Sequence, residues 1–450
     1  NINEINGDND NRVNPGETIQ LEISLQNKPG WSIAYNISAN LSCDNDDVNV
    51  DIETTTLDSL KAGLISETES PIQITISEFA KIQTISCILN VQSNNDMENS
   101  RSYNTSIPLM IEITLNQKNF PILTNEIKAS PIVVDLNKDG ENELIYSDNS
   151  GNVIVLNSDN SSFGTDSLFI NTGDDIWGSP AVADIDLDGD LDIIVSSKSK
   201  FIYIMDQSGL HTMIELDSYL MGTPAIGQLD QDEYLEIVIA GYSSDSKKMF
   251  ALNHDGTSVN GFPVITNRKV LNGVSLYDIN NNGLDDIIFG SDSDDISLIL
   301  DNGTIEWSFN QINNNIQTAP SIIKNNDDLY ICGGSDDGFL YCLNELGELE
   351  FKVDSEDNIT TSPSFVEINN TPYVFFGSES NSIYASNLNG EILNGWPQYI
   401  LGDPIGSIIF SDINNDNNNE VILVTSSGYL YIFSLNGNVI EPFPIKINYS

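Results

Sequence analysis

Four short acidic segments of the chain place oxygen-bearing side chains at one common spacing. Asp or Asn stands at positions 1, 3 and 5 of each segment, and Asp or Glu stands at position 9. The segments begin at Asp135, Asp184, Asp278 and Asp412. Because alternate residues of a tight loop point to the same side, the oxygens at positions 1, 3 and 5 are expected to converge. Such a set predicts a site for a hard cation, and Ca²⁺ fits best because it accepts about six to eight oxygen ligands in a flexible geometry.

The other positions of the loop complete the predicted ligand set. Gly at position 6 (Gly140, Gly189 and Gly283) permits a sharp reversal, after which the residue at position 7 offers its backbone carbonyl. The predicted ligands are Asp135, Asn137, Asp139, Glu141 and Glu143; Asp184, Asp186, Asp188, Asp190 and Asp192; Asp278, Asn280, Asn282, Leu284 and Asp286; and Asp412, Asn414, Asp416, Asn418 and Glu420. The alternative is a set of metal-free Asx turns, which favour the same residue types. Four copies at one phase of a longer repeat favour calcium.

Three further copies of the segment depart from this pattern. One keeps Asp230, Asp232 and Glu236 but has Gln228 at position 1 and Glu233 at position 6, so it is a weaker candidate for a fifth site. The other two have lost the pattern. Lys324 occupies position 1 in one, and Thr371-Pro372 follows Glu367 and Asn369 in the other. A hairpin is expected to close there without metal.

The acidic segments recur within a longer repeat of short apolar runs rich in Ile, Val, Tyr and Phe, a pattern typical of an all-β protein. Equivalent strands begin at Pro131, Pro180, Pro224, Val274, Pro320, Pro363 and Ile408, which are 43 to 50 residues apart. This period fits four short strands per blade of a propeller. The repeat predicts a seven-bladed β-propeller over residues 119–450, with an open β-solenoid as the alternative. The segments near residues 119–125 and 442–448 are expected to close the ring.

Residues 1–118 lack the repeat and show longer alternating runs at residues 19–25, 72–76 and 109–113. About seven short strands in this length predict a β-sandwich. The fold class is therefore all-β, with a sandwich domain preceding the propeller and a boundary near Asn116–Asn119.

With loop, period and flanking strands in agreement, residues 120–450 resemble the FG-GAP/VCBS repeats of integrin-α-type and bacterial secreted propellers. The resemblance rests on the loops at residues 135–143 and 184–192, while Gly178-Ser179-Pro180 and Gly222-Thr223-Pro224 match the family signature only in part. It implies calcium held between the first two strands of a blade, and a role in adhesion, ligand binding or assembly.

The first domain resembles the immunoglobulin-like modules of bacterial secreted proteins. Gly7-Asp8-Asn9-Asp10 and Asn14-Pro15-Gly16-Glu17 match their opening motif, while Arg12 replaces the usual Gly. The resemblance implies a further calcium candidate formed by Asp8, Asp10 and Glu17, against the alternative of a plain surface turn.

Charge and cysteine content restrict the partners and the compartment. The chain has 17 Lys and Arg against 67 Asp and Glu, a formal charge of −50, which repels nucleic acid and anionic membranes. No apolar stretch approaches the ~18 residues that would span a bilayer. Four cysteines in two local pairs, Cys43 with Cys87 and Cys332 with Cys342, predict disulfides and an extracellular or cell-surface location, against the alternative of four buried thiols. Because the chain starts at Asn1, we expect a processed chain or an excised fragment.

Glycosylation depends on a source organism that modifies Asn. Sequons occur at Asn36, Asn40, Asn104, Asn160, Asn302, Asn358 and Asn448.

Catalysis is not expected, because the two histidines, His211 and His254, lie near no recognisable nucleophile motif. The leading hypothesis is an extracellular calcium-binding structural or adhesive protein whose partners are surface glycans, other proteins or further copies of itself. In one version it forms a filament, with residues 1–7 or 443–450 adding a strand to the next subunit. The alternatives are a carbohydrate- or protein-binding module of a larger secreted enzyme, and an enzyme acting on polysaccharide across the propeller face.

Overall fold

The computed structural model describes residues 2–7, 12–78, 80–96, 101–116, 120, 122–164, 168–244, 246–266, 268–414 and 416–447. All the secondary-structure elements within these ranges are β-strands, so the all-β prediction is confirmed. None of the described residues forms a helix that could cross a membrane. The chain divides into two compact units, Asn1–Ile122 and Leu123–Ser450, a boundary four residues beyond the predicted one.

The first unit is a sandwich of two four-stranded sheets. One contains β1 (Ile2–Asn6), β2 (Thr18–Leu21), β8 (Ile72–Ile76) and β5 (Val48–Ile52), in that order. The other contains β10 (Ser102–Ile113), β9 (Gln83–Asn94), β4 (Ala34–Cys43) and β6 (Thr54–Leu60). The unit also contains a separate two-stranded sheet of β3 (Ser24–Gln26) and β7 (Ile65–Glu67). Strands β9 and β10 have 12 residues each, whereas the four strands of the first sheet have four or five.

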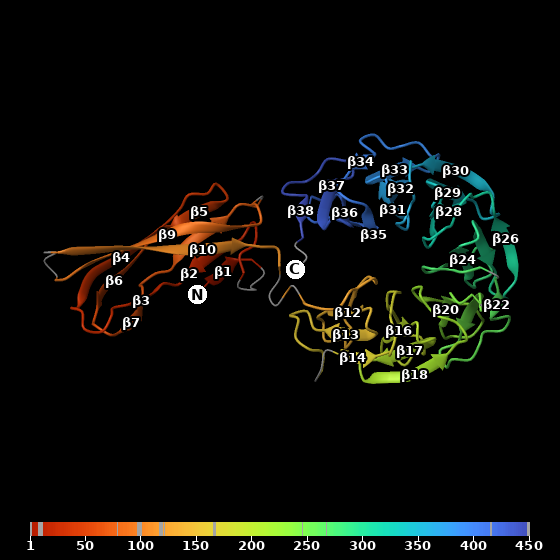
Figure 1. Ribbon diagram of the computed structural model, residues 1–450, viewed down its shortest axis with the longest axis horizontal. Helices are drawn as coiled ribbons and strands as arrows, with labels where there is room; N and C mark the ends of the chain where they lie inside the picture. Colours follow the sequence, from red (N-terminus) through yellow and green to blue (C-terminus); the bar gives the residue numbers. More distant parts are fainter. Residues whose placement is uncertain are drawn as a thin grey trace. The chain divides into compact units, whose positions relative to one another are not determined.

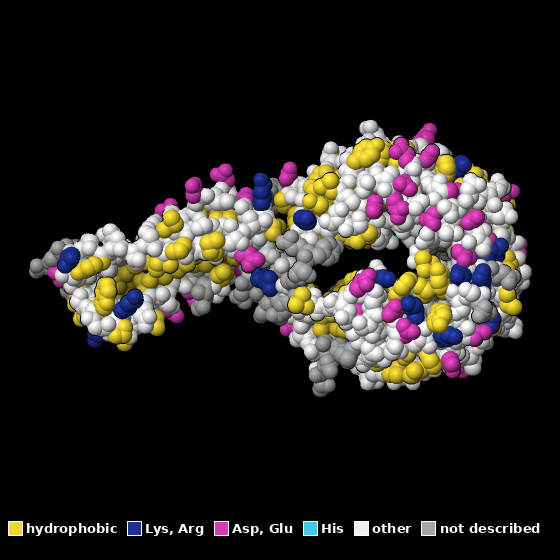
Figure 2. Space-filling model, in the orientation of Figure 1, with side chains coloured by type: hydrophobic (Ala, Val, Ile, Leu, Met, Phe, Trp, Pro, Cys, Tyr) yellow, Lys and Arg dark blue, Asp and Glu magenta, His cyan; other side chains and the backbone are white. Residues whose placement is uncertain are grey.

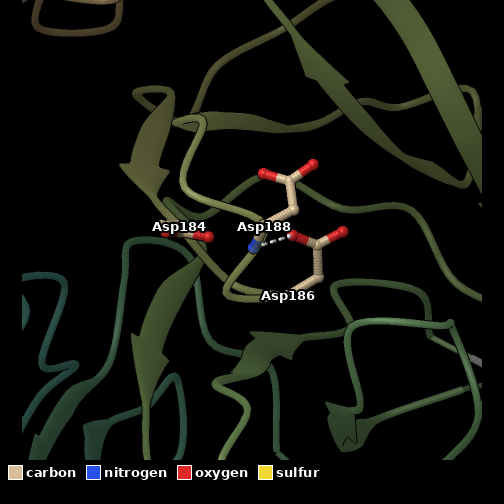
Figure 3. Close-up of side chains that lie close together, drawn as sticks. All are labelled: Asp184, Asp186 and Asp188. Carbon is tan, nitrogen blue, oxygen red and sulfur yellow. Dashed lines mark hydrogen bonds between the residues drawn. The ribbon is translucent and has the colours of Figure 1, made fainter.

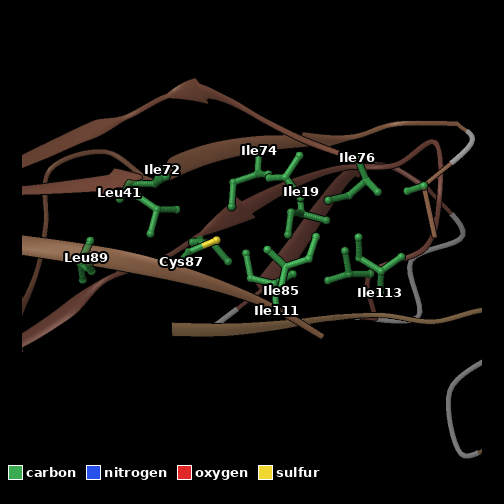
Figure 4. Packing of buried hydrophobic residues seen from close by; sticks show 14 of the residues in the cluster. Ile19, Leu41, Ile72, Ile74, Ile76, Ile85, Cys87, Leu89, Ile111 and Ile113 are labelled. Carbon is green, nitrogen blue, oxygen red and sulfur yellow. The ribbon is translucent and has the colours of Figure 1, made fainter. Parts of the chain in front are cut away.

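The core of the first unit follows from the alternation of its strands. Ile72, Ile74 and Ile76 are fully buried, while the Gln and Thr residues between them are half-buried. On the opposing sheet, Ile85 and Leu89 are buried in the same cluster (Figure 4). Since successive side chains of a strand point to opposite faces, alternate apolar residues of the two sheets meet in one layer.

The predicted disulfides are both present, and each joins neighbouring strands. Cys43 of β4 lies directly opposite Cys87 of β9 and is bonded to it. In antibody domains the corresponding bond links the two sheets, so this sandwich differs from that type. Cys332 and Cys342 are likewise bonded register partners, on either side of the turn between β28 and β29.

Within the described residues, the second unit contains seven four-stranded antiparallel sheets, each made of four consecutive strands, and Figure 1 shows them arranged in a ring. Their strands are β11 (Ile132–Val134), β12 (Glu143–Ser147), β13 (Asn152–Leu156) and β14 (Leu168–Asn171); β15 (Ala181–Ala183), β16 (Asp192–Ser196), β17 (Phe201–Asp206) and β18 (Gly209–Glu215); β19 (Ala225–Gly227), β20 (Glu236–Ala240), β21 (Lys248–Leu252) and β22 (Val264–Ile265); β23 (Ser275–Tyr277), β24 (Asp286–Gly290), β25 (Ile296–Ile299) and β26 (Ile305–Phe309); β27 (Ser321–Asn325), β28 (Asp328–Gly334), β29 (Phe339–Leu343) and β30 (Leu349–Asp354); β31 (Ser364–Ile368), β32 (Thr371–Ser378), β33 (Ser382–Asn387) and β34 (Gln398–Tyr399); β35 (Pro404–Ser411), β36 (Glu420–Thr425), β37 (Tyr429–Ser434) and β38 (Ile445–Lys446).

A backbone hydrogen bond recurs in all seven sheets and shows the regularity of the repeat. The turn between the second and third strands donates an N–H to a carbonyl of the segment leading into the same sheet, with N–O distances of 2.8–3.0 Å. The pairs, donor first, are Asn149–Glu126, Lys198–Asp175, Tyr242–Tyr219, Asp292–Lys269, Asp336–Asn315, Glu379–Asn358 and Ser426–Asp403.

Hydrophobic cores lie between consecutive sheets of the second unit, where side chains of both faces of the short strands are buried. Six such clusters link the seven sheets in sequence. No cluster of the described residues links the last sheet, β35–β38, to the first, β11–β14, and we call this junction the seam. Val133 of β11 and Ile409 of β35 are exposed, at 63% and 57% of their full area.

The described parts of the predicted closing segments do not exchange strands across the seam. Ile445–Lys446 forms the outer strand of its own sheet, and the described residues 122–125 form no strand. Acidic side chains are scattered over the surface of both units (Figure 2), in keeping with the formal charge of −50.

Candidate metal sites

The four predicted loops occupy equivalent places in the second unit. Each connects the first strand of its sheet to the second, and the carboxylate at position 9 is the first residue of that second strand. Glu143 begins β12, Asp192 begins β16, Asp286 begins β24 and Glu420 begins β36. The first and second strands therefore hold the predicted ligands at one end of each of these four sheets.

The carboxylate at position 1 fixes the course of the loop. Asp135 accepts the backbone N–H groups of Asp139 and Gly140, both at 3.0 Å. Asp278 and Asp412 accept the corresponding pairs in their loops, and Asp184 accepts the N–H of Gly189 at 3.1 Å. The residue at position 5 accepts the N–H of position 7 at 2.8 Å in all four loops. The backbone carbonyl of position 7 remains a predicted ligand.

The sharp reversal falls at position 6, as predicted. Gly140, Gly189 and Gly283 have φ angles of +94°, +96° and +90°, in the left-handed region where a side chain is strained. The last loop has Asn417 at this position, with φ +68°. Asn tolerates this conformation better than other residues with a side chain, which explains why this loop closes without Gly.

The carboxylate at position 9 is buried in each loop. One of its oxygens accepts the N–H of position 2, as Glu143 does from Leu136 at 2.7 Å and Asp192 from Ile185 at 3.1 Å. Burial raises the pKa of Asp192 and of Asp286 to about 6. Asp186 and Asp188 raise the pKa of Asp192 further, because a second negative charge nearby disfavours ionisation. A buried carboxylate among other carboxylates is stabilised by a proton or by a cation.

The second loop shows most directly that the residues fit a cation. Oxygens of Asp184, Asp186 and Asp188 lie within 4.8 Å of one another, and Figure 3 shows the three side chains around one region. The Oδ1 atom of Asp184 is buried and has no hydrogen-bond partner among the described residues. Buried polar atoms are normally paired, and a hard cation held by these carboxylates would satisfy this oxygen.

The weaker fifth candidate also brings three carboxylates together, but from positions 3, 5 and 9 of the loop and not from positions 1, 3 and 5 as in the second loop. Oxygens of Asp230, Asp232 and Glu236 also lie within 4.8 Å of one another, and the Oε1 atom of Glu236 is buried without a described partner. Burial, and then the two Asp charges, raise the pKa of Glu236 to about 7. The side-chain amide of Gln228 donates to the backbone carbonyls of Asp230 and Asp232, both at 2.8 Å. These two hydrogen bonds hold together a loop that has Glu233 at position 6, where the sequence pattern calls for Gly.

In the loops that contain Asn, some amides present nitrogen to the site. Asn280 donates through Nδ2 to Asp286 at 3.2 Å, and Asn414 donates to Glu420 at the same distance. Since an amide binds a cation through its oxygen, ligation requires these amides to turn by half a rotation. Asp301, from the turn after β25, also contacts the third loop by accepting from Asn282 at 3.2 Å. Only its Asp-Asn-Gly turn sequence could have indicated this contribution.

The two copies that lost the pattern close as tight hairpins, as predicted. Asn325 pairs with Asp328, and Ile368 pairs with Thr371, leaving two residues in each turn. Asn369 and Asn370 both have positive φ, as in a type I′ turn. At the N-terminal candidate, Asp8 and Asp10 lie outside the described residues, and the Glu17 carboxylate accepts the N–H of Asn14 at 2.8 Å.

Neither described histidine belongs to a Ser-His-Asp triad. His211 contacts Asp206 at 2.8 Å and Ser208 at 3.4 Å, but both contacts use the same nitrogen, Nε2. A triad needs Ser and Asp on opposite nitrogens of the ring. His254 lies against Tyr234, with ring centroids 4.1 Å apart.

The fold and the acidic loops together define a propeller repeat protein. Residues 135–195, which include the first two loops and strands β12 to β15, match the FG-GAP-like repeat family. No curated protein matches the chain.

Among solved structures, the chain is similar to BamB from Moraxella catarrhalis, with a TM-score of 0.48 and 16% identity over 70% of this chain and 88% of that chain. It is also similar to BBS1N in complex with ARL6DN, with a TM-score of 0.47 and 14% identity over 70% and 93% of the two chains. The WD40 β-propeller domain of Doa1 gives a TM-score of 0.44 and 12% identity over 69% and 93%.

Proposed function

We propose that the protein is an extracellular, calcium-binding structural or adhesive protein, in which a seven-bladed β-propeller follows an immunoglobulin-like domain. The observation that carries the calcium part is the convergence of carboxylate oxygens in repeated loops, with buried oxygens of Asp184 and Glu236 left without described partners. Two disulfides and the acidic surface support an extracellular location. In this role calcium stiffens the blades, and the ring presents a rigid surface to a partner.

Calcium titration of the metal-free protein tests the proposal, and five sites in residues 123–450 are the expected result. The loop with Asp230, Asp232 and Glu236 supplies the fifth site. The double substitution Asp230→Asn and Asp232→Asn is expected to reduce the stoichiometry by one, because it removes both charges next to Glu236. Glu367→Gln is the matched control, since Glu367 is an exposed acid of β31 in a sheet whose loop lacks the pattern. Unchanged stoichiometry in the double variant would show that this loop is only a turn.

Assembly into a filament is the finer version of this proposal. The described parts of both terminal segments are already paired: β1 with β2, and β38 with β37. Strand addition therefore takes the form of a partner strand joining the free edge of β1, which is the outermost strand of its sheet. Electron microscopy at high protein concentration with calcium is expected to show end-to-end assemblies, and particles that remain single would contradict this version.

A further inference from the structure

Part of the inner face of the first unit is not covered by the opposite sheet. Strands β9 and β10 run for 12 residues, whereas β2 and β8 have only four and five. Along β9 and β10, the side chains on the core-facing side change from apolar to polar and aromatic where the strands extend past β2 and β8. Ile85 and Ile113 are buried in the core, but further along the same faces stand Ser93, Thr105 and Tyr103. The sequence thus places polar and aromatic residues where the second sheet ends.

A cavity of about 610 Å³ occupies this position. Residues of β9 and β10 form one wall, and β3 with the loop at residues 27–33 forms another. Asn27 holds this loop in place, because its Nδ2 atom donates to the carbonyls of Ser32 and Leu60 at 2.8 and 2.9 Å. The loop carries Trp31, whose side chain is 64% exposed at the cavity. The cavity is therefore bounded by β-strands and by a loop that hydrogen bonds hold in place.

The lining differs chemically from the rest of this acidic chain. Among the described residues that line it there is no Asp or Glu, and Lys28 is the only charged one. The guanidinium of Arg101 lies nearby, 5.4 Å from the centre of the Tyr103 ring. Two exposed aromatic rings, Trp31 and Tyr103, face a lining rich in Asn, Gln, Ser and Thr. The Oδ1 atom of Asn95 is buried and accepts no hydrogen bond within the described part of the chain. An acceptor of this kind is satisfied by a donor from a ligand or from water.

We propose that this cavity binds a neutral glycan. The faces of a sugar ring carry C–H groups that pack on aromatic rings, and its hydroxyls both donate to and accept from amides and hydroxyl side chains. An anionic ligand would meet two cations, Lys28 and the Arg101 beside Tyr103, in the field of a chain with a formal charge of −50. A wholly apolar ligand would leave the amides unpaired. The inference rests on the first unit alone and holds whether or not the loops of the second unit bind calcium.

The test is titration of the full chain with neutral hexasaccharides of glucose, xylose, mannose, galactose and N-acetylglucosamine, followed by calorimetry and tryptophan fluorescence. At least one hexasaccharide is expected to bind with a Kd in the micromolar to millimolar range. Trp31→Ala is expected to weaken that binding at least tenfold, and Tyr103→Ala to weaken it several-fold. Trp31 is the only tryptophan before residue 122, so its emission should shift on binding in the parent protein.

Controls separate ligand binding from folding. Tyr399→Ala removes an aromatic ring of the second unit that is 73% exposed, and Ile65→Ala removes a 65% exposed side chain of β7 outside the cavity. Both variants should bind as the parent does. Trp31→Phe keeps a ring at the site and should retain part of the affinity. Failure of every neutral hexasaccharide to bind, binding of oligogalacturonate alone, or unchanged binding in both Trp31→Ala and Tyr103→Ala would overturn the proposal.

Discussion

Chelation of calcium is expected to lower the midpoint of thermal unfolding of residues 123–450 by at least about 10 °C. Each site that is filled at a hundred times its Kd stabilises the native state by about 2.7 kcal/mol, because the ion binds the folded loop and not the unfolded chain. Five such sites exceed what this shift requires, since about 1 kcal/mol moves the midpoint of a large domain by roughly 2–4 °C. The measurement is differential scanning calorimetry in excess calcium and in excess EGTA.

The identity of the ion supplies the specificity control. Calcium added back to the chelated protein should restore the midpoint, whereas magnesium should restore little of it, because Mg²⁺ demands a smaller octahedral site and gives up its water reluctantly. Asp184→Asn with Asp188→Asn should remove part of the calcium-dependent shift, and Glu367→Gln should leave the shift unchanged. Identical midpoints with and without EGTA would mean that the loops are Asx turns without metal.

The free energy of unfolding is expected to depend on pH more steeply in the chelated protein than in the calcium-loaded protein. The folded-state pKa values of Asp192, Asp286 and Glu236 are raised to about 6, 6 and 7, from 3.8 for Asp and 4.5 for Glu. The chelated native state therefore binds protons more tightly than the unfolded chain between about pH 4 and pH 7. Its free energy of unfolding should rise as the pH falls from 7.5 to 5.5. One pKa unit corresponds to about 1.4 kcal/mol, so the three residues together contribute several kcal/mol.

The calcium-loaded protein should show little pH dependence from these carboxylates over the same interval, because bound calcium keeps them ionised and the unfolded carboxylates gain few protons above pH 5.5. Urea unfolding at pH 7.5 and 5.5, with calcium or with EGTA, measures both trends. The pKa of His211 is raised, mainly by its hydrogen bond to Asp206, and changes stability in the same direction as the chelated loops. His211→Gln should therefore leave most of the effect in place, while Asp192→Asn should reduce it. An equally steep pH dependence in the two forms would contradict the assignment.

The repeat and its loops could be predicted from sequence because their determinants are local. A strand of the second unit is a short apolar run, and the position-9 carboxylates, such as Asp286, begin the second strand of a sheet. The left-handed turn at position 6 follows from Gly283 by the same local rule. Spacing along the chain therefore determines which oxygens can converge.

Features that depend on distant residues could not be read in the same way. The loop of Asp230 departs from the pattern at position 1, where the side chain of Gln228 donates to two backbone carbonyls of the loop, a contact that spacing alone does not predict. The pairing of Cys43 with Cys87 was predicted from their number and neighbourhood. That the bond lies within one sheet depends on the register of β4 and β9. The cavity at Trp31 arises from unequal strand lengths in two sheets, which no local pattern reports.

The seam gives the second unit two ends, although its sheets are arranged in a ring. A disc with equal cores at every junction has no preferred place to come apart. With six cores between seven sheets in the described residues, we expect fraying to start at the first and last sheets, as it does at the ends of a linear stack of repeats. The loops at residues 135–143 and 412–420 belong to these two sheets. Ions bound there would stabilise the two terminal sheets against local unfolding. The chain's resistance to proteolysis and to mechanical force would then depend on the calcium concentration around it.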